Sequence, residues 1–134
     1  MKLLIVEDEE LVLQILASVI RNAATEHGVE IEITEACELN GAIAAAPSAD
    51  VILCDGHFPT RRAVIAFDQQ PWLAVYAFAR PGIDLGKKRY ALMTGDESAA
   101  EAAERKGITV FRKPLDFPAV TAWLFVADGF ALAA

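Results

Sequence analysis

The stretch Val51-Ile52-Leu53-Cys54-Asp55-Gly56-His57-Phe58-Pro59 passes from four apolar residues to a carboxylate, with a proline four positions after that carboxylate. The apolar run, residues 51–54, has the length of a strand and carries no polar side chain on either face. Strands without a polar face are typical of parallel sheets that helices cover on both sides. We therefore predict a central strand here, with Asp55 at its carboxyl end.

Four other short apolar runs lie elsewhere along the chain, and we predict five strands in all. They are Lys2–Val6, Val29–Thr34, Val51–Cys54, Tyr90–Met93 and Ile108–Phe111. The second run differs from the others because its apolar residues alternate with glutamate and threonine. Such alternation predicts an edge strand with one face in water.

Helical patterns separate the predicted strands. They are a broad apolar stripe from Leu11 to Ile20, the alanine-rich Cys37–Ala46, the apolar Trp72–Ala79, the charged Glu97–Lys106, and a segment that starts at Pro118 and ends before Gly129. We expect the third helix to stop at Arg80-Pro81-Gly82, because proline disrupts a helix interior. Gly107 is expected to close the fourth helix.

Strict alternation of strands and helices predicts an α/β fold, a doubly wound five-stranded parallel sheet of the flavodoxin-like (βα)5 type. The edge character of residues 29–34 favours the strand order 2-1-3-4-5. We expect residues 1–134 to form a single domain, because their number is that of one ordinary domain. In sheets of this kind ligands bind beyond the carboxyl ends of the strands, at the switch point between strands 1 and 3.

Composition excludes several classes of protein. Hydrophobic residues make up 54% of the chain, which is too many for a disordered protein. The formal net charge is −7, with 11 acids and 2 bases in residues 1–60, so a surface for nucleic acid is not expected. No apolar run approaches the roughly 20 residues that span a bilayer. Two cysteines are too few for a disulfide scaffold.

We therefore expect a cytoplasmic protein without membrane contact. The apolar tail, residues 130–134, either packs back on the domain, contributes to a dimer or frays.

Carboxylates, a hydroxyl and an ammonium group lie at the carboxyl ends of four of the predicted strands. They are Glu7-Asp8 after the first strand, Asp55 after the third, Thr94-Gly95 after the fourth and Lys113-Pro114 after the fifth. Crowded carboxylates repel one another unless a cation lies among them, and oxygen ligands suit Mg²⁺. A lysine and a hydroxyl beside such a metal suit a phosphoryl group. The carboxylate of Asp55 is itself a nucleophile that can form an aspartyl phosphate.

With these motifs in this order, the chain resembles the receiver domain of response regulators over nearly its whole length. That family has an acidic pair after strand 1, a phosphoacceptor aspartate after strand 3 with proline four residues on, threonine or serine after strand 4, and Lys-Pro after strand 5. The matching residues here are Glu7-Asp8, Asp55 with Pro59, Thr94-Gly95 and Lys113-Pro114. The resemblance implies a stand-alone receiver of a two-component or phosphorelay system, which catalyses only its own phosphorylation and dephosphorylation.

The resemblance also implies a metal site for Mg²⁺. Asp8 is expected to bind the ion directly and Glu7 through water, while Asp55 is both a ligand and the phosphoacceptor. The backbone carbonyl of His57 completes the protein ligands.

The phosphoryl group is expected to contact three further residues. By the resemblance, Lys113 contacts the Asp55 carboxylate and then the phosphoryl group, the Thr94 hydroxyl follows a phosphoryl oxygen on switching, and the Gly95 amide donates to another oxygen. The Lys113-Pro114 peptide bond is expected to be cis, as in the family.

The implied partners are proteins. A sensor histidine kinase or a phosphotransfer protein donates the phosphoryl group from a phosphohistidine, and an unidentified downstream protein reads the result. The surface expected to bind it, and to form a homodimer if there is one, combines the fourth helix, the fifth strand and the fifth helix.

The chain departs from the family pattern at three places. Val110 stands at the switch position, where an aromatic residue is usual, and the adjacent Phe111 is expected to point to the other face of the sheet. Asp55 and Thr94 are 39 positions apart, so we expect a lengthened or remodelled third-helix region within residues 56–89. Gly56 and His57 follow the expected phosphoacceptor. In the family, the first of these two positions usually holds a large apolar residue.

Two alternatives stay open. A pseudo-receiver would bind a partner without phosphorylation, and Val110, Gly56 and the long third-helix region favour it. A phosphatase of the haloacid-dehalogenase type would also use an aspartate nucleophile, but the first strand lacks its Asp-x-Asp pair and the chain has no room for a cap domain.

Overall fold

The computed structural model describes residues 1–59 and 70–125 and contains a five-stranded, all-parallel sheet. The strands are β1 (Lys2–Val6), β2 (Glu32–Ala36), β3 (Val51–Asp55), β4 (Arg89–Thr94) and β5 (Thr109–Arg112). Their order is β2-β1-β3-β4-β5. The predicted fold class and strand order are therefore confirmed.

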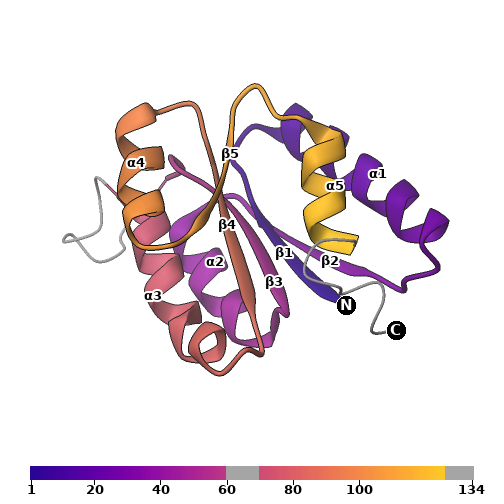
Figure 1. Cartoon of the computed structure of the whole chain (residues 1–134), viewed down its shortest axis with the longest axis horizontal. Coiled ribbons are helices and arrows are strands. Elements are labelled where there is room, and N and C mark those ends of the chain that lie inside the picture. Colours follow the sequence, from indigo (N-terminus) through magenta and orange to yellow (C-terminus); the bar gives the residue numbers. More distant parts are fainter. Residues whose placement is uncertain (60–69, 126–134) are drawn as a thin grey trace.

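Helices cover both faces of the sheet (Figure 1). They are α1 (Glu10–Glu26), α2 (Leu39–Ala45) followed by the 3₁₀ turn η1 (Ala46–Ser48), α3 (Pro71–Asp84), α4 (Glu97–Arg105) and α5 (Phe117–Phe125). Helices α1 and α5 pack on one face, and α2, α3 and α4 pack on the other. The loops that lead into α1, α4 and α5 lie together at the top of the view in Figure 1, at one end of the sheet.

Strand β2 begins at Glu32, three residues later than predicted. The end of α1 explains the delay, because Gly28 adopts a left-handed φ of 67° and the Val29 amide donates to the Ala24 carbonyl. This pair of features is a Schellman cap, so Val29 closes the helix instead of opening the strand. Strand β2 is exposed at Glu32, Thr34 and Glu35, as expected of an edge.

The predicted end of the third helix at Arg80-Pro81-Gly82 is wrong, because α3 continues through Pro81 to Asp84. The helix ends in another Schellman cap, in which Gly86 has a φ of 71° and the Lys87 amide donates to the Gly82 carbonyl. One proline removes a single amide donor, and the bonds of this last turn keep the segment helical.

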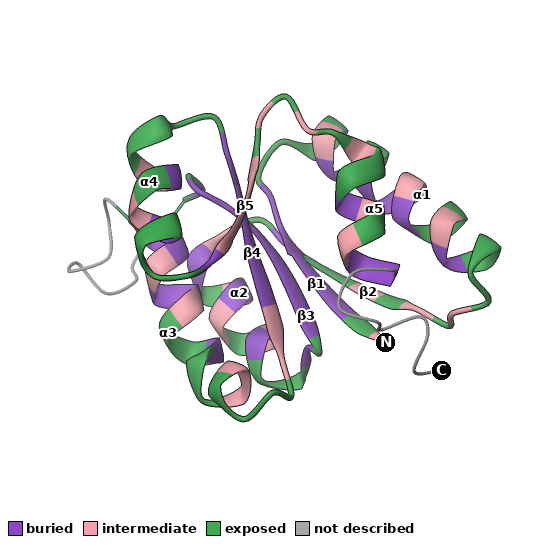
Figure 2. Cartoon of the chain, viewed as in Figure 1, coloured by how far each residue is buried: buried purple, intermediate pink, exposed green. Residues whose placement is uncertain are grey.

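Two apolar cores lie on the two faces of the sheet. Strand β3 is buried at every position, while the outer faces of the helices are exposed (Figure 2). Val110 packs into the core beneath α2, α3 and α4, whereas Phe111 packs into the core beneath α1 and α5. The prediction that these neighbours face opposite ways is confirmed, so Phe111 does not replace an aromatic residue at position 110.

Three sequence-based expectations fall on residues 60–69 and 126–134, outside the described part of the chain. They concern the first half of the expected insertion, the end of the last helix beyond Phe125, and the apolar tail. Among the described helices, none combines the length and apolar character that a membrane crossing requires.

The central strand should dominate the stability of the fold. Leu53 of β3 is fully buried, so Leu53→Ala leaves a cavity and should lower the free energy of unfolding by about 2–5 kcal/mol. Leu11→Ala is the matched control, because Leu11 is 68% exposed and its loss should change stability by about 0.5 kcal/mol or less. Urea denaturation followed by circular dichroism measures both. Equal effects of the two substitutions would contradict the central position of β3.

Candidate functional site

Four strands deliver polar side chains to one end of the sheet. Val6 of β1 pairs with Cys54 of β3, so the next residues along these strands, Glu7 and Asp55, lie beside each other. Thr94 ends β4, and Lys113 directly follows β5. The convergence that the sequence predicts at the carboxyl ends of the strands is present in the structure.

Three carboxylates form a tight cluster at this end. One oxygen each from Glu7, Asp8 and Asp55 can be chosen so that all lie within 4.8 Å of one another. Glu7 is fully buried and Asp55 is 6% exposed, whereas Asp8 faces solvent. Mg²⁺ binds oxygens at about 2.1 Å, so ligands on opposite sides of the ion are about 4.2 Å apart. The spacing and the chemistry of the three carboxylates fit such an ion.

Lys113 contacts both buried carboxylates. Its Nζ lies 3.0 Å from Glu7 Oε2 and 3.2 Å from Asp55 Oδ1. The Lys113 amide donates to the Thr94 carbonyl at 2.9 Å, which holds the start of the β5–α5 loop against β4. The Lys113-Pro114 bond is cis, as predicted.

The charges in this cluster do not balance, because one ammonium faces three carboxylates. Burial raises the pKa of Glu7, and the charge of Asp55 raises it further against the opposing effect of Lys113. Burial alone would lower the pKa of Lys113, but the charges of Asp55 and Glu7 raise it overall. The lysine therefore stays protonated, and the surplus of negative charge makes the site attractive to a cation.

Backbone amides fix the orientation of the buried carboxylates. The Glu9 amide donates to Glu7 Oε1 at 3.2 Å, and the His57 amide donates to Asp55 Oδ1 at 3.4 Å. Cys54 lies beside Asp55 but is fully buried, and burial raises the pKa of its thiol far above the ordinary value. Cys54 is thus a core residue and not a nucleophile.

The side chain of His57 turns toward α4, where it has a partner that the sequence does not indicate. His57 Nε2 lies 3.1 Å from Asp96 Oδ2, while Asp96 Oδ1 accepts the Ser98 amide at 2.9 Å and caps α4. The hydrogen bond from His57 lowers the pKa of Asp96, and the capping amides of Ala99 and Ser98 lower it further. The imidazole therefore links the loop after Asp55 to the start of α4.

Thr94 and Gly95 complete this end of the sheet. Thr94 is 2% exposed, and its Oγ1 accepts the Asp96 amide at 3.0 Å. A Cβ on Gly95 would lie 3.8 Å from the Lys113 Cβ, so the β4–α4 loop and the lysine are close neighbours.

Arg112 is a second residue that the sequence analysis missed. In the register of β4 and β5 it stands opposite Thr94, whereas Val110 stands opposite Leu92. The Arg112 guanidinium donates to both Glu97 and Glu104 of α4, with the closest N···O distances at 2.9 Å. The residue next to Thr94 on this face is therefore a charged group that ties α4 to β5.

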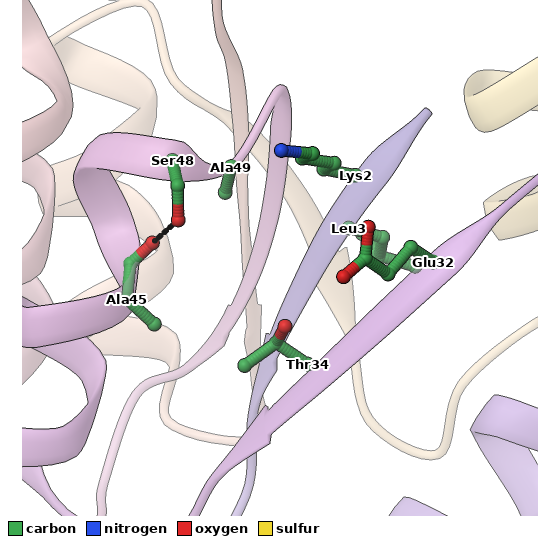
Figure 3. A pocket seen from close by; sticks show the side chains of 7 residues that line it. All are labelled: Lys2, Leu3, Glu32, Thr34, Ala45, Ser48 and Ala49. Atoms are coloured by element: carbon green, nitrogen blue, oxygen red, sulfur yellow. Dashed lines mark hydrogen bonds between the residues drawn. The ribbon is translucent and has the colours of Figure 1, made fainter.

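One of the hollows on the described surface lies next to the carboxylate cluster. A groove of about 380 Å³ adjoins the carboxylates and is lined by Glu7, Asp8, Glu10, Leu13, Glu35, Ala36 and Cys37. Figure 3 shows another pocket, at the opposite end of the sheet, between the starts of β1 and β2 and the end of α2. Its volume is about 60 Å³, which is far below that of a small-molecule site.

No protein-family model matches the sequence, and no curated protein matches it either. Solved structures do match. A two-component transcriptional regulator AraC from Clostridium phytofermentans is 20% identical with a TM-score of 0.66, over 99% of this chain and 95% of that one. The chemotaxis response regulator CheY4 of Vibrio cholerae is 20% identical with a TM-score of 0.64, over 92% and 94%.

A third similar structure is the phosphorylated cyanobacterial phytochrome response regulator RcpA. It is 15% identical with a TM-score of 0.62, over 98% of this chain and 94% of that one. These likenesses show that the chain has the fold of response-regulator receiver domains. Function has to be argued from the residues of the site, because one fold serves many functions.

Replacing Glu7 by glutamine should stabilise the protein at neutral pH in the absence of divalent cations. The raised pKa of Glu7 means that the folded state disfavours its ionised form. The wild type therefore has its full stability below the pKa of Glu7 in the unfolded chain. It loses part of that free energy of unfolding as pH rises through the pKa of Glu7 in the folded state. Glu7→Gln has no such carboxyl group and avoids that loss. The difference in free energy of unfolding between this variant and the wild type should therefore vanish toward pH 4. Urea denaturation between pH 4 and 8 measures the difference.

Glu35→Gln is the control, because it removes one negative charge from the same end of the sheet but not from the carboxylate cluster. A lower free energy of unfolding for Glu7→Gln at pH 8 would mean that the contact with Lys113 outweighs burial.

Proposed function

We propose that this protein is a phosphoacceptor receiver of a two-component or phosphorelay system. One observation carries the proposal: Lys113 contacts two buried carboxylates, Glu7 and Asp55, at the ligand-binding end of a receiver fold. A surface cluster of acids would serve solubility, but burial of the two carboxylates costs several kcal/mol for each ion. A site for chemistry accounts for that cost.

Asp55 is the nucleophile in this proposal. Its carboxylate forms a bond to phosphorus while the bond from phosphorus to the nitrogen of a phosphohistidine breaks, and the electron pair leaves with that nitrogen. The phosphohistidine belongs to a sensor kinase or a phosphotransfer protein. Lys113 neutralises the transferred oxygens, and the Thr94 hydroxyl and the Gly95 amide donate hydrogen bonds to them.

Glu7, Asp8 and Asp55, with the backbone carbonyl of His57, would hold Mg²⁺. The ion supplies positive charge that offsets the carboxylates and the phosphoryl oxygens when it is bound. Exposed Asp8 gives the cluster an open side toward solvent, while buried Glu7 is held by Lys113 and the Glu9 amide.

The output of the switch is a protein contact. The face formed by α4, β5 and α5 is our proposed surface for a downstream protein or a second copy of the chain, in the cytoplasm. Arg112 joins α4 to β5 there through Glu97 and Glu104, so a displacement of the β4–α4 loop would alter this face.

Phosphorylation of Asp55 is tested by intact mass after incubation with Mg²⁺ and acetyl phosphate. We expect the mass of one phosphoryl group to be added to the wild type and to Asp50→Asn, but not to Asp55→Asn. Asp50 is the matched control, because this exposed aspartate precedes β3 at the opposite end of the sheet and contacts the Lys2 amide.

Two other results would replace the proposal. No gain of mass with any phosphodonor would favour a pseudo-receiver that binds its partner without phosphorylation. Steady release of phosphate from phosphate esters would favour a phosphatase.

Asp8→Ala should weaken Mg²⁺ binding about tenfold or more, because one of the three clustered carboxylates is lost. Glu10→Ala is the control, since Glu10 lines the adjoining groove but lies outside the cluster. Isothermal titration calorimetry measures both affinities. If the two variants lost affinity equally, the ion would respond to general negative charge and the assigned ligands would be wrong.

A further inference from the structure

Gly56 leaves a space next to the phosphoacceptor that Thr94 occupies. A Cβ built on Gly56 would lie 2.7 Å from Thr94 Oγ1 and 3.0 Å from Thr94 Cβ. A non-bonded contact of 2.7 Å is shorter than real Cβ atoms make, so any side chain at position 56 would displace Thr94 or the loop. The backbone does not demand glycine here, because the positive-φ glycines of the described chain are Gly28, Gly86 and Gly107. The constraint at position 56 is therefore one of space.

Both sides of this contact are held in place. The Gly56 amide donates to the Met93 carbonyl at 2.9 Å, which fastens the loop after Asp55 to β4. Thr94 is buried at the end of the same strand, and its Oγ1 accepts the Asp96 amide. Neither partner can retreat without breaking one of these hydrogen bonds.

These contacts determine which hydrogen bonds the Thr94 hydroxyl can still make. Because its oxygen accepts the Asp96 amide, its proton remains available as a donor. Val110 is aliphatic and stands opposite Leu92, so it supplies no aromatic ring that could move together with Thr94. Thr94 can therefore keep this position only because Gly56 has no side chain.

We propose that Gly56 is a positioning residue, which keeps the Thr94 hydroxyl beside the phosphoacceptor before phosphorylation takes place. This inference rests on the proposed function, since the hydroxyl is useful there as a donor to a phosphoryl oxygen. Position 110 holds valine in this chain, so no aromatic residue there can position Thr94. In this proposal Gly56 has that role.

The test is a double-mutant cycle in the full chain, with Gly56→Ala, Thr94→Ala and both together. The rate of phosphorylation by acetyl phosphate with Mg²⁺ should fall about tenfold in each single variant, because each loses the hydrogen bond to a charged oxygen. The double variant should be no slower than Thr94→Ala, since Gly56 acts only through Thr94. Gly41→Ala in α2 is the control and should keep the wild-type rate, because its Cβ would meet only the flexible end of Glu38 and Ala36.

Two further measurements separate positioning from a merely structural role. Gly56→Ala should bind Mg²⁺ with wild-type affinity in calorimetry, and a loss of affinity would overturn the proposal in favour of an effect on the metal ligands. Gly56→Ala should also lower the free energy of unfolding, and by less in the Thr94→Ala background than in the wild type.

Equal phosphorylation rates of Gly56→Ala and wild type would overturn the positioning role, as would strictly additive effects in the cycle. Failure of the wild type to gain a phosphoryl group would overturn the proposed function instead. The denaturation cycle would still decide whether Gly56 sets the place of Thr94.

Discussion

The ammonium of Lys113 between the carboxylates of Glu7 and Asp55 is the interaction on which this end of the molecule depends. Two adjacent buried carboxylates would repel each other and lose their hydration, and each loss amounts to several kcal/mol. A lysine 3.0 and 3.2 Å away offsets part of that cost, and backbone amides offset more. The remaining negative charge is what a divalent cation or an incoming phosphoryl group with its metal would balance. The site is therefore stable enough to form and still incomplete, which suits a transient ligand.

The architecture around that interaction could be predicted because the pattern of apolar runs and helical stripes along the chain determines it. Strand β3 has no polar residue before Asp55, and a strand of that kind lies in the middle of a parallel sheet. Carboxyl ends of parallel strands meet at one edge, so Glu7, Asp55, Thr94 and Lys113 had to converge once the strand order was right.

The helix boundaries were harder to predict, because they depend on caps. Pro81 looked like a stop, but the left-handed Gly86 ends α3, and the bonds that make it a cap come from residues after the helix.

Other features of the site could not be predicted, because they depend on how side chains from distant segments meet. Nothing in the sequence pairs His57 with Asp96, which are 39 positions apart, or places Arg112 between Glu97 and Glu104. The role of Gly56 was equally hidden. Sequence patterns indicate glycine where a turn needs a left-handed φ, whereas this glycine is needed because a threonine from another strand fills the space.

These contacts together form a continuous connection from Asp55 to the surface of α4. Asp55 is followed by Gly56, whose lack of a side chain leaves room for Thr94, and by His57, which contacts Asp96. Thr94 and Asp96 are joined by a hydrogen bond, Asp96 caps α4, and Arg112 holds the same helix against β5. A charge added to Asp55 would act on two of these links at once, through the hydroxyl of Thr94 and the loop that carries His57. Because directed bonds from Asp96 and Arg112 hold α4, a change in either bond would act on that helix directly. The chain thus has a physical route from the strand ends to the surface of α4, even though valine stands at position 110.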